Sequence, residues 1–493
     1  MVMQTIQIRL TEEQIDVLQS LVGSGIYPSK SEAVRDAVRK YIRAWELGMP
    51  PEQIQAAEKK VEQELIKVIE EEAKQYQKVK GTVDYYPEEK AAKEYILSKL
   101  RNTARNFNFK EIETPAFETL ELLTAKSGEE IKTQIFTLEK KSTEQLGLRF
   151  DLTVPAARLY IEKQKELPKP VKWFYIDKMW RYEAPQKGRL REFYQFGVEL
   201  FGSDKPEADA EVISLAIDSL KNLGLTSNDI VVKLNNKKLL EGLLLQSIPK
   251  EKLEDVIRII DKSAKISEED FENELKKLKL DENQISDVKK IISFKGKPSE
   301  IINKISAKTE DTKSALLEIN KTAGLLSAYE DFIVLDLSVA RGLAYYTGTV
   351  FEIFDKNGEF RAIAGGGRYD KLIELFNGES TPATGFGMGY ATLSLLLESR
   401  GLIKKQDLSP DYYVAYFPDV KKEAFELVQK LRKNNVVETD LMERKFGKQM
   451  EYANSIKAKK LIVIGENEVK SKVIKVKDMN TGLEVIKKWD EVK

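Results

Sequence analysis

The sequence predicts a multidomain α+β protein, and three observations support that fold class. The chain has 493 residues, which corresponds to roughly three or four domains at ~100–200 residues each. Apolar residues make up 42% of the chain, enough for ordinary hydrophobic cores. Segments with the alternation of strands and segments with the periodicity of helices both occur along the chain, so a mixture of the two is expected.

Residues 1–47 are expected to form a small strand–helix–helix module. Residues 5–10 alternate strictly between polar and apolar side chains, which predicts a short half-buried strand. Thr11 is the expected N-cap of a first helix, and a second helix is expected from Ser29 to about Ala44. A unit of this size is too small to bury a core alone, so we expect it to dimerise.

This N-terminal module resembles the ribbon-helix-helix DNA-binding module, in which paired strands enter the major groove. On that resemblance the DNA-contact candidates are Thr5, Gln7 and Arg9, while the alternating apolar side chains face the core. The alternative is a dimerisation module that contacts no DNA, and so short a strand does not decide between the two.

A charged helical linker is expected at residues 48–80, where apolar positions are widely spaced on a charged background. A larger core is expected over residues 81–405, with a helical insertion at about 235–325 that is rich in lysine and glutamate. Two strands are expected at 171–181 and 192–201, on either side of a polar loop.

The last domain is expected over residues 408–493 as a small α/β structure. Strands alternate with helices after Pro410, beginning with a strand at Tyr412–Phe417, and such alternation implies a layered α/β arrangement. The domain is rich in lysine, which fits nucleic-acid contact and is equally explained by a solvated surface.

Histidine and cysteine are both absent from the chain. Their absence excludes an imidazole base, a Ser-His triad, a cysteine nucleophile, a disulfide and a His/Cys zinc site. We therefore expect chemistry from arginine, lysine, carboxylates, tyrosine and backbone dipoles, and the sequence identifies no metal site built from protein ligands. Lys+Arg 80 balances Asp+Glu 80, so the net charge does not indicate a nucleic-acid partner.

The sequence predicts a cytoplasmic protein that does not span a membrane. It contains no run of about 18 apolar residues, and the stretch Met1–Thr5 does not begin a secretory signal.

Two segments rich in arginine and tyrosine indicate the chemistry. One runs from Arg181 to Gln195 and the other from Arg341 to Glu352. Arginine suits bidentate phosphate contacts and a developing phosphoryl charge, glycine lets a backbone approach a ligand closely, and tyrosine supplies an aromatic wall with a hydroxyl donor. Together these residue types predict a pocket for a nucleotide and a small polar organic ligand.

From about residue 81 to 493 the chain resembles histidyl-tRNA synthetase of the archaeal type, a class II aminoacyl-tRNA synthetase. Pro115 resembles the end of class II motif 1, residues 173–202 resemble the strand–loop–strand of motif 2, and residues 341–352 resemble the histidine-specific signature. The resemblance implies an antiparallel sheet core with helices and a C-terminal α/β anticodon-binding domain. It also implies ATP and Mg²⁺ as cofactors, histidine and tRNA-His as substrates, and a homodimer.

The resemblance also implies roles for individual residues. Arg181, which matches the motif 2 arginine on the α-phosphate, and Arg341, which matches a further catalytic arginine, are the catalytic candidates. Gln186 falls in the loop that meets the tRNA acceptor end. The implied ATP-binding residues are Arg181, Glu183, Arg189, Arg191 and Phe193. The implied histidine-binding residues are Asp151, Thr153, Gln195, Glu199, Arg341, Tyr345 and Tyr346.

Two positions depart from the family pattern. Thr392 stands where family members commonly carry the motif 3 arginine, and Ala344 replaces a frequent aspartate of the signature. The missing arginine removes a contact to the γ-phosphate, and Arg189 and Arg191 are the expected substitutes.

The function implied is activation of histidine to histidyl-adenylate and transfer to tRNA-His, and two alternatives remain. One is a non-catalytic paralogue acting as the regulatory subunit of ATP phosphoribosyltransferase, against which Arg341 and the C-terminal domain argue. The other is a histidine-sensing DNA-binding regulator that uses the N-terminal module. The absence of histidine likewise has two explanations: selection on the enzyme's own synthesis, or a composition bias of the source.

Overall fold

The structure is a computed structural model that describes residues 78–125, 132–140, 143–263, 266–340, 345–489 and 491, with a few helical positions between 15 and 39. The chain divides into two compact units, Met1–Asp84 and Tyr85–Lys493. Several predicted residues lie outside the described ones, namely Thr5, Gln7, Arg9, Arg341 and Ala344.

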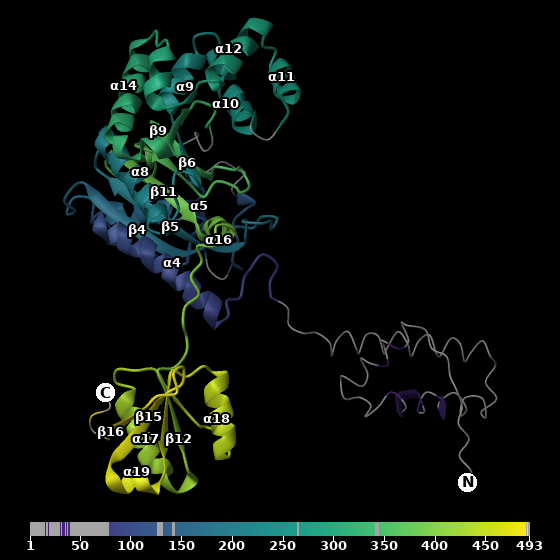
Figure 1. Cartoon of the computed structure of the whole chain (residues 1–493). Helices are drawn as coiled ribbons and strands as arrows, with labels where there is room; N and C mark the ends of the chain where they lie inside the picture. The colour runs from purple at the N-terminus through teal and green to yellow at the C-terminus, as the bar shows by residue number, and fades with distance from the viewer. Residues whose placement is uncertain are drawn as a thin grey trace, which may run out of the picture. The chain divides into compact units, whose positions relative to one another are not determined.

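A mixed, largely antiparallel sheet forms the centre of the larger unit (Figure 1). Its strands are β1 (Lys110–Glu111), β4 (Val171–Trp180), β5 (Glu192–Phe201), β6 (Ile230–Asn236), β7 (Lys295–Gly296), β8 (Ile333–Asp336), β9 (Thr349–Asp355), β10 (Ala364–Arg368) and β11 (Ala383–Gly389). Within the described part of the chain they pair in the order β1-β4-β5-β11-β10-β9-β6-β8-β7. The pairs β1·β4 and β6·β8 are parallel, and β4 and β5 confirm the two strands predicted around the polar loop.

Helices α4 (Pro87–Asn106) and α8 (Pro206–Lys221) cover one face of this sheet. Each begins with a proline in its first turn and acidic residues beside it, a combination that suits the fixed φ of proline and the positive end of the helix dipole. Phe196 and Val198 of β5 share a hydrophobic cluster with Leu100 of α4. Because side chains alternate along a strand, the odd-numbered residues of β5 lie on the opposite face, where the site is found.

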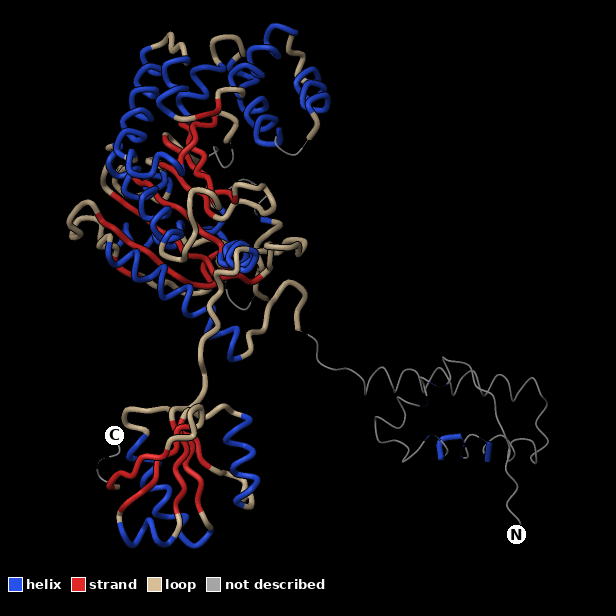
Figure 2. Tube along the Cα trace, in the orientation of Figure 1, coloured by secondary structure: helices blue, strands red, loops and turns tan. Residues whose placement is uncertain are grey.

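The insertion expected at about 235–325 is largely helical and gathers at one end of the sheet (Figure 2). Its helices are α9 (Lys237–Leu244), α10 (Leu253–Lys262), α11 (Glu268–Lys277), α12 (Glu282–Ile292), α13 (Pro298–Ile301) and α14 (Glu310–Leu325). Helix α14 contacts both α9 and α8, which joins the insertion to the core. The insertion is not wholly helical, because β7 pairs with β8 at the sheet edge.

The C-terminal part has its own sheet and its own hydrophobic clusters. Its elements are β12 (Tyr412–Tyr416), α17 (Lys421–Leu431), β13 (Val437–Thr439), α18 (Phe446–Ser455), β14 (Lys460–Ile464), α19 (Glu466–Ser471), β15 (Val473–Asp478) and β16 (Glu484–Lys488). Strand β12 pairs in parallel with β13 and β14. Val414 packs in a cluster with Leu427 of α17, and Tyr413 packs in another with Ala453 of α18, so a helix covers each face. The predicted α/β domain is confirmed.

None of the helices in the described ranges has both the length and the apolar character that crossing a membrane requires.

Candidate nucleotide and amino-acid site

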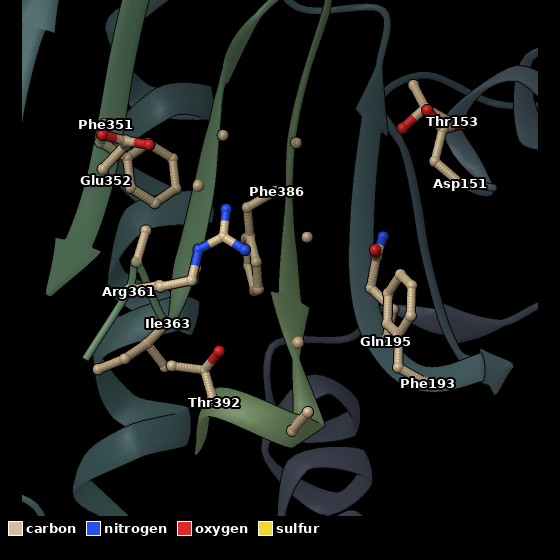
Figure 3. A pocket seen from close by; sticks show the side chains of 18 of the residues that line it. Asp151, Thr153, Phe193, Gln195, Phe351, Glu352, Arg361, Ile363, Phe386 and Thr392 are labelled. Atoms are coloured by element: carbon tan, nitrogen blue, oxygen red, sulfur yellow. The ribbon is translucent and has the colours of Figure 1, made fainter. Parts of the chain in front are cut away.

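A cavity of about 320 Å³ opens on the sheet face opposite α4 and α8, a size typical of small-ligand sites. Its walls come from the β4–β5 loop, from strands β9 to β11 and from the start of α16 (Tyr390–Ser399), as Figure 3 shows in part. The sequence-predicted residues that line it are Asp151, Thr153, Arg181, Glu183, Arg189, Phe193, Gln195, Tyr345 and Tyr346. These residues come from three separate stretches of the chain.

The β4–β5 loop fixes Arg181 at one side of the cavity. Its backbone N–H donates to the carbonyl of Arg191 at 2.8 Å and closes the hairpin. Its side-chain Nε donates to the carbonyl of Phe150 at 3.1 Å, and the guanidinium carbon lies 5.1 Å from the centre of the Phe193 ring. The cation and the aromatic ring are therefore neighbours on the same wall.

Arg189 and Arg191, which alternate in the sequence, have different environments. Arg189 lines the cavity and forms an ion pair with Glu183. Arg191 donates to the carbonyl of Glu183 at 3.1 Å, its guanidinium lies 4.5 Å from the Tyr182 ring, and it is not part of the cavity lining. Gln186 also lies outside the lining, at the loop tip, where its backbone pairs with that of Arg189.

Thr392 lines the cavity at the start of α16 and is only 6% exposed. Its hydroxyl donates to the carbonyl of Gly188 at 3.3 Å, which ties the helix to the tip of the β4–β5 loop. A threonine at this position supplies a neutral hydrogen bond and no charge.

Glu199 lies beneath the cavity floor rather than in its lining and is 1% exposed. The hydroxyl of Tyr369 donates to one carboxylate oxygen, and the hydroxyl of Tyr175 lies 3.5 Å from the other. Gln195 in turn donates to the Tyr175 hydroxyl at 3.3 Å. A chain of hydrogen bonds therefore connects the cavity wall at Gln195 to the buried carboxylate.

Tyr345, Tyr346 and Tyr369 form an aromatic group beside that carboxylate. The ring centres of Tyr345 and Tyr346 are 4.3 Å apart, and those of Tyr345 and Tyr369 are 6.0 Å apart. Burial raises the pKa of Tyr345 above its usual value, and burial also raises the pKa of Tyr175, with Glu199 adding to the second shift. Both hydroxyls stay protonated near neutral pH and keep their donor capacity.

Close approaches at two glycines make this arrangement possible. A Cβ on Gly197 would lie 2.2 Å from the Tyr175 hydroxyl. A Cβ on Gly385 would lie 2.4 Å from the Tyr369 hydroxyl and 2.8 Å from a carboxylate oxygen of Glu199. Any larger residue would displace the groups that surround the carboxylate.

A buried arginine supports the site from behind. Arg149 is 2% exposed, donates to the carbonyls of Pro115 at 3.0 Å and Lys178 at 3.2 Å, and forms an ion pair with Asp177. It joins the segment that ends at Pro115 to β4, close to the Phe150 carbonyl that holds Arg181.

Sequence reasoning did not single out Tyr369, Arg149 or Arg361, all three of which belong to the site or support it. Tyr369 directly follows Gly365–Arg368, a segment that contains three consecutive glycines. Such a triplet indicates close backbone packing and could have pointed to Tyr369. Arg149 and Arg361 have no comparable local signal.

Comparison with known proteins agrees with this geometry. Residues 81–393 match the family model of histidyl-tRNA synthetase, and residues 412–493 match the anticodon binding domain. The chain belongs to the histidyl-tRNA synthetase family. Residues 4–44 of the synthetase match the family of ribbon-helix-helix proteins of the copG type.

The synthetase is similar to curated archaeal relatives over most of its length. It is 41% identical to the histidine–tRNA ligase of Pyrococcus furiosus over 424 residues, which cover 84% of this chain and 97% of that one. It is 38% identical to the ligase of Haloarcula marismortui over 417 residues, 83% of this chain and 95% of that one.

Among solved structures, the synthetase resembles histidyl-tRNA synthetase from Nostoc sp. PCC 7120, with a TM-score of 0.71, 26% identity, and coverage of 85% of this chain and 98% of that one. It also resembles a protein from Bacillus halodurans described as an ATP phosphoribosyltransferase regulatory subunit/histidyl-tRNA synthetase, with a TM-score of 0.67, 27% identity, and coverage of 79% and 98%. Because the curated relatives are ligases, the regulatory-subunit alternative is not favoured.

Proposed function

We propose that this pocket divides the reaction of a histidine–tRNA ligase between a nucleotide end and an amino-acid end. Family membership and the archaeal relatives make the chain a histidine–tRNA ligase. One observation carries the assignment of the pocket: it brings Arg181 and Phe193 together with the tyrosines that lie next to the buried carboxylate.

The nucleotide end is formed by Arg181, Phe193, Glu183 and Arg189. The Phe193 ring offers a flat surface for adenine, and Glu183, which lines the same cavity, accepts from an exocyclic amine. Arg181 binds the α-phosphate, where a fixed guanidinium stabilises the charge that develops as the phosphoryl group is transferred. Arg191 acts from outside the cavity lining, since it holds the backbone of Glu183.

Mg²⁺ is expected with ATP, and the donor set fits a cation shared with the substrate. Within the described residues, no group of three or more carboxylates is suited to holding a metal ion by itself. Mg²⁺ commonly binds through one or two carboxylates together with substrate phosphates, and Glu352 is the carboxylate on the β9 side of the lining. Glu352 would hold the ion, which would neutralise phosphate charge.

The amino-acid end is formed by Asp151, Thr153, Gln195 and the tyrosines, with Glu199 behind them. An imidazole offers two ring nitrogens that each need a partner. Carboxylate and tyrosine hydroxyl groups supply these partners, and a site that satisfies both nitrogens rejects isosteres that lack them. Arg341 is proposed as the second catalytic arginine from its place in the histidine-specific signature.

The chemistry needs alignment and charge neutralisation rather than a protein base. A carboxylate oxygen of histidine attacks the α-phosphorus of ATP, the new P–O bond forms, and pyrophosphate leaves with the electron pair of the broken bond. A ribose hydroxyl at the 3′ end of tRNA-His then attacks the histidyl carbonyl and releases AMP. A chain without histidine or cysteine can perform both steps.

The decisive test is histidine-dependent ATP–pyrophosphate exchange by the purified full chain, followed by charging of tRNA-His. Arg181→Ala should lower kcat for exchange more than it raises the KM for ATP, because its contact strengthens as charge develops. A wild-type chain that exchanges no pyrophosphate with histidine present would overturn the proposed division of the pocket.

The remaining parts are proposed to serve substrates and assembly. Gln186 at the loop tip meets the tRNA acceptor end, and the domain at 408–493 contacts the anticodon, which its family match supports. The core at 81–405, with its insertion at about 235–325, is proposed to form a homodimer in the cytoplasm. The helical linker predicted at 48–80 stays a prediction, since most of it lies outside the described residues.

A second function is proposed for residues 1–47, supported by the ribbon-helix-helix match over residues 4–44. The module binds DNA through Thr5, Gln7 and Arg9, and affinity should fall steeply with salt because phosphate contacts release counterions. Arg9→Ala should weaken binding of DNA from the chain's own upstream region and relax preference at one base pair. Retardation of no fragment by the full chain would leave the module as a dimerisation unit.

A further inference from the structure

Arg361 is a cation in the pocket that no part of the proposed division uses. It lies in the segment between β9 and β10, it is half-buried, and it is part of the cavity lining. Figure 3 shows its guanidinium pointing toward the cavity, with the Phe193 ring on the opposite side.

The strand pairing sets the separation of the two walls that carry Arg361 and Phe193. On β5, Gln195 pairs with Gly389 of β11, and the N–H of Gly389 donates to the carbonyl of Ile363 at 3.2 Å. Phe193 is two residues before Gln195 and Arg361 is two residues before Ile363. Two strand spacings of about 4.8 Å put these two walls roughly 10 Å apart.

That spacing fits a flat base between the two side chains. A base in contact with one group on each face needs about 7–8 Å between the groups, and the long arginine side chain shortens the distance from its wall. The floor between the walls includes Gly389 of β11, where an added Cβ would meet no other atom within 4 Å, whereas the Gln195 side chain covers Gly387. A planar ligand can therefore lie directly above the strand at Gly389.

Arg181 and Arg189 lie at other places in the site. Arg181 is bound to the Phe150 carbonyl on the same wall as Phe193, and Arg189 is paired with Glu183. Thr392, on the Arg361 side, is too short to cover a base and donates to the Gly188 carbonyl instead. Arg361 is therefore the lining group whose geometry suits the face of a base opposite Phe193.

We propose that Arg361 stacks on the adenine of ATP from the side opposite Phe193, so that the base is held between an aromatic ring and a guanidinium plane. Arg361 then supplies the cation at the nucleotide end that Thr392 does not. A guanidinium is planar and weakly hydrated, and it stacks on aromatic faces more readily than an ammonium does. This inference rests on the proposed function, because it assumes that the nucleotide occupies this end of the pocket.

The test compares three variants in histidine-dependent ATP–pyrophosphate exchange. Arg361→Ala should raise the KM for ATP roughly ten- to hundredfold, since a base–side-chain stack contributes that much to affinity, while the KM for histidine changes less than about twofold. Arg361→Lys keeps the charge but loses the plane, so it should show a defect of similar size. Lys356→Ala removes an exposed cation of the same β9–β10 connection, bonded to the Ser227 carbonyl outside the cavity, and should match the wild type.

Direct binding of ATP to the full chain, measured by calorimetry without histidine, gives a second readout that needs no turnover. It should show the same loss for Arg361→Ala and none for Lys356→Ala. An unchanged KM and Kd for ATP in Arg361→Ala would overturn the inference, and wild-type behaviour of Arg361→Lys would overturn the stacking geometry in favour of a point charge. Absence of exchange by the wild type counts against the proposed function, whereas exchange with an intact ATP KM in Arg361→Ala counts against the role of Arg361 alone.

Discussion

Replacing Tyr369 by phenylalanine removes one donor from the buried carboxylate of Glu199 and leaves the aromatic ring in place. Tyr369 is 2% exposed and Glu199 is 1% exposed, so water has no access to replace the lost hydrogen bond. The Tyr175 hydroxyl lies 3.5 Å from the other carboxylate oxygen, which is long for a strong hydrogen bond. The substitution therefore removes the closer of two tyrosine contacts.

The size of the expected effect follows from the charge of the Glu199 carboxylate, which accepts the hydrogen bond. A hydrogen bond to an ionised group contributes about 1.5–3 kcal/mol. If Glu199 orients the imidazole of bound histidine, a loss of that size raises the KM for histidine roughly ten- to hundredfold. The nucleotide end is on another part of the sheet, so the KM for ATP should change less than about twofold.

The assay is ATP–pyrophosphate exchange with histidine and ATP varied in turn. Tyr160→Phe is the matched control, because the Tyr160 hydroxyl is buried in the same hydrophobic cluster as Tyr369 and has no hydrogen-bond partner among the described residues. The control should keep both KM values. A Tyr369→Phe variant with an unchanged KM for histidine, or with equal increases for both substrates, would refute the idea that the Tyr369–Glu199 contact positions the amino acid.

Three further outcomes are expected. Burial, the largest cause, lowers the pKa of Lys93 to about 8, with its ammonium 3.9 Å from the Tyr85 ring and 4.2 Å from the Tyr194 ring. The unfolded chain binds this proton more tightly than the folded chain does, so the contribution of Lys93 to the free energy of unfolding rises with pH from about 8 toward 10.5. Lys93→Met should therefore raise Tm at about pH 7, and the increase in Tm should be smaller at about pH 10. Arg149→Met leaves backbone carbonyls and a carboxylate without their buried partner and should lower the free energy of unfolding by about 3–5 kcal/mol in denaturant titrations. Phe417, 44% exposed, stacks on Phe446 with ring centres 5.0 Å apart, so Phe417→Ala should raise the KM for tRNA-His in aminoacylation roughly fivefold or more while leaving pyrophosphate exchange unchanged.

The sequence predicted those strands and domains whose side-chain pattern can be recognised within a short segment. Strands β4 and β5 follow from alternation of side chains around a polar loop, and the C-terminal α/β domain follows from alternating elements. Strand β7, a pair of residues inside a largely helical insertion, has too short a pattern to detect. Its place in the sheet depends on β8, which lies far along the chain.

In the site, the motifs predicted which residues come together, whereas the orientation of individual side chains depends on the folded structure. The resemblance brought Arg181, Phe193 and Tyr345 into one predicted pocket, and the structure brings these residues together. The resemblance assigned the same role to Arg189 and Arg191. In the folded loop, Arg189 lines the cavity and pairs with Glu183, whereas Arg191 donates to the Glu183 backbone carbonyl. Their sequence spacing carries no information about which side chain turns inward.

Tyr369 and Arg361 were missed because their partners come from strands that are distant in the sequence. The contact between Tyr369 and Glu199 depends on the register of β10 and β11 against β5. The position of Arg361 opposite Phe193 depends on the same register. A sheet register that crosses three strands is set by the whole core, so a single sequence without its structure does not reveal it.

The complete absence of histidine from a histidyl-tRNA synthetase leads to a last prediction. Translation of a chain with His 0 in 493 residues consumes no histidyl-tRNA, so its rate should not depend on the product of the enzyme that it encodes. In a cell-free extract depleted of charged tRNA-His, this chain should be made at the rate seen in the replete extract, whereas a variant with several exposed lysines replaced by histidine should stall. Equal slowing of both chains would refute the independence. Selection and composition bias are separated by a different observation: if other proteins of the source also lack histidine, bias is sufficient, whereas ordinary histidine usage elsewhere leaves selection on the synthesis of this enzyme as the explanation.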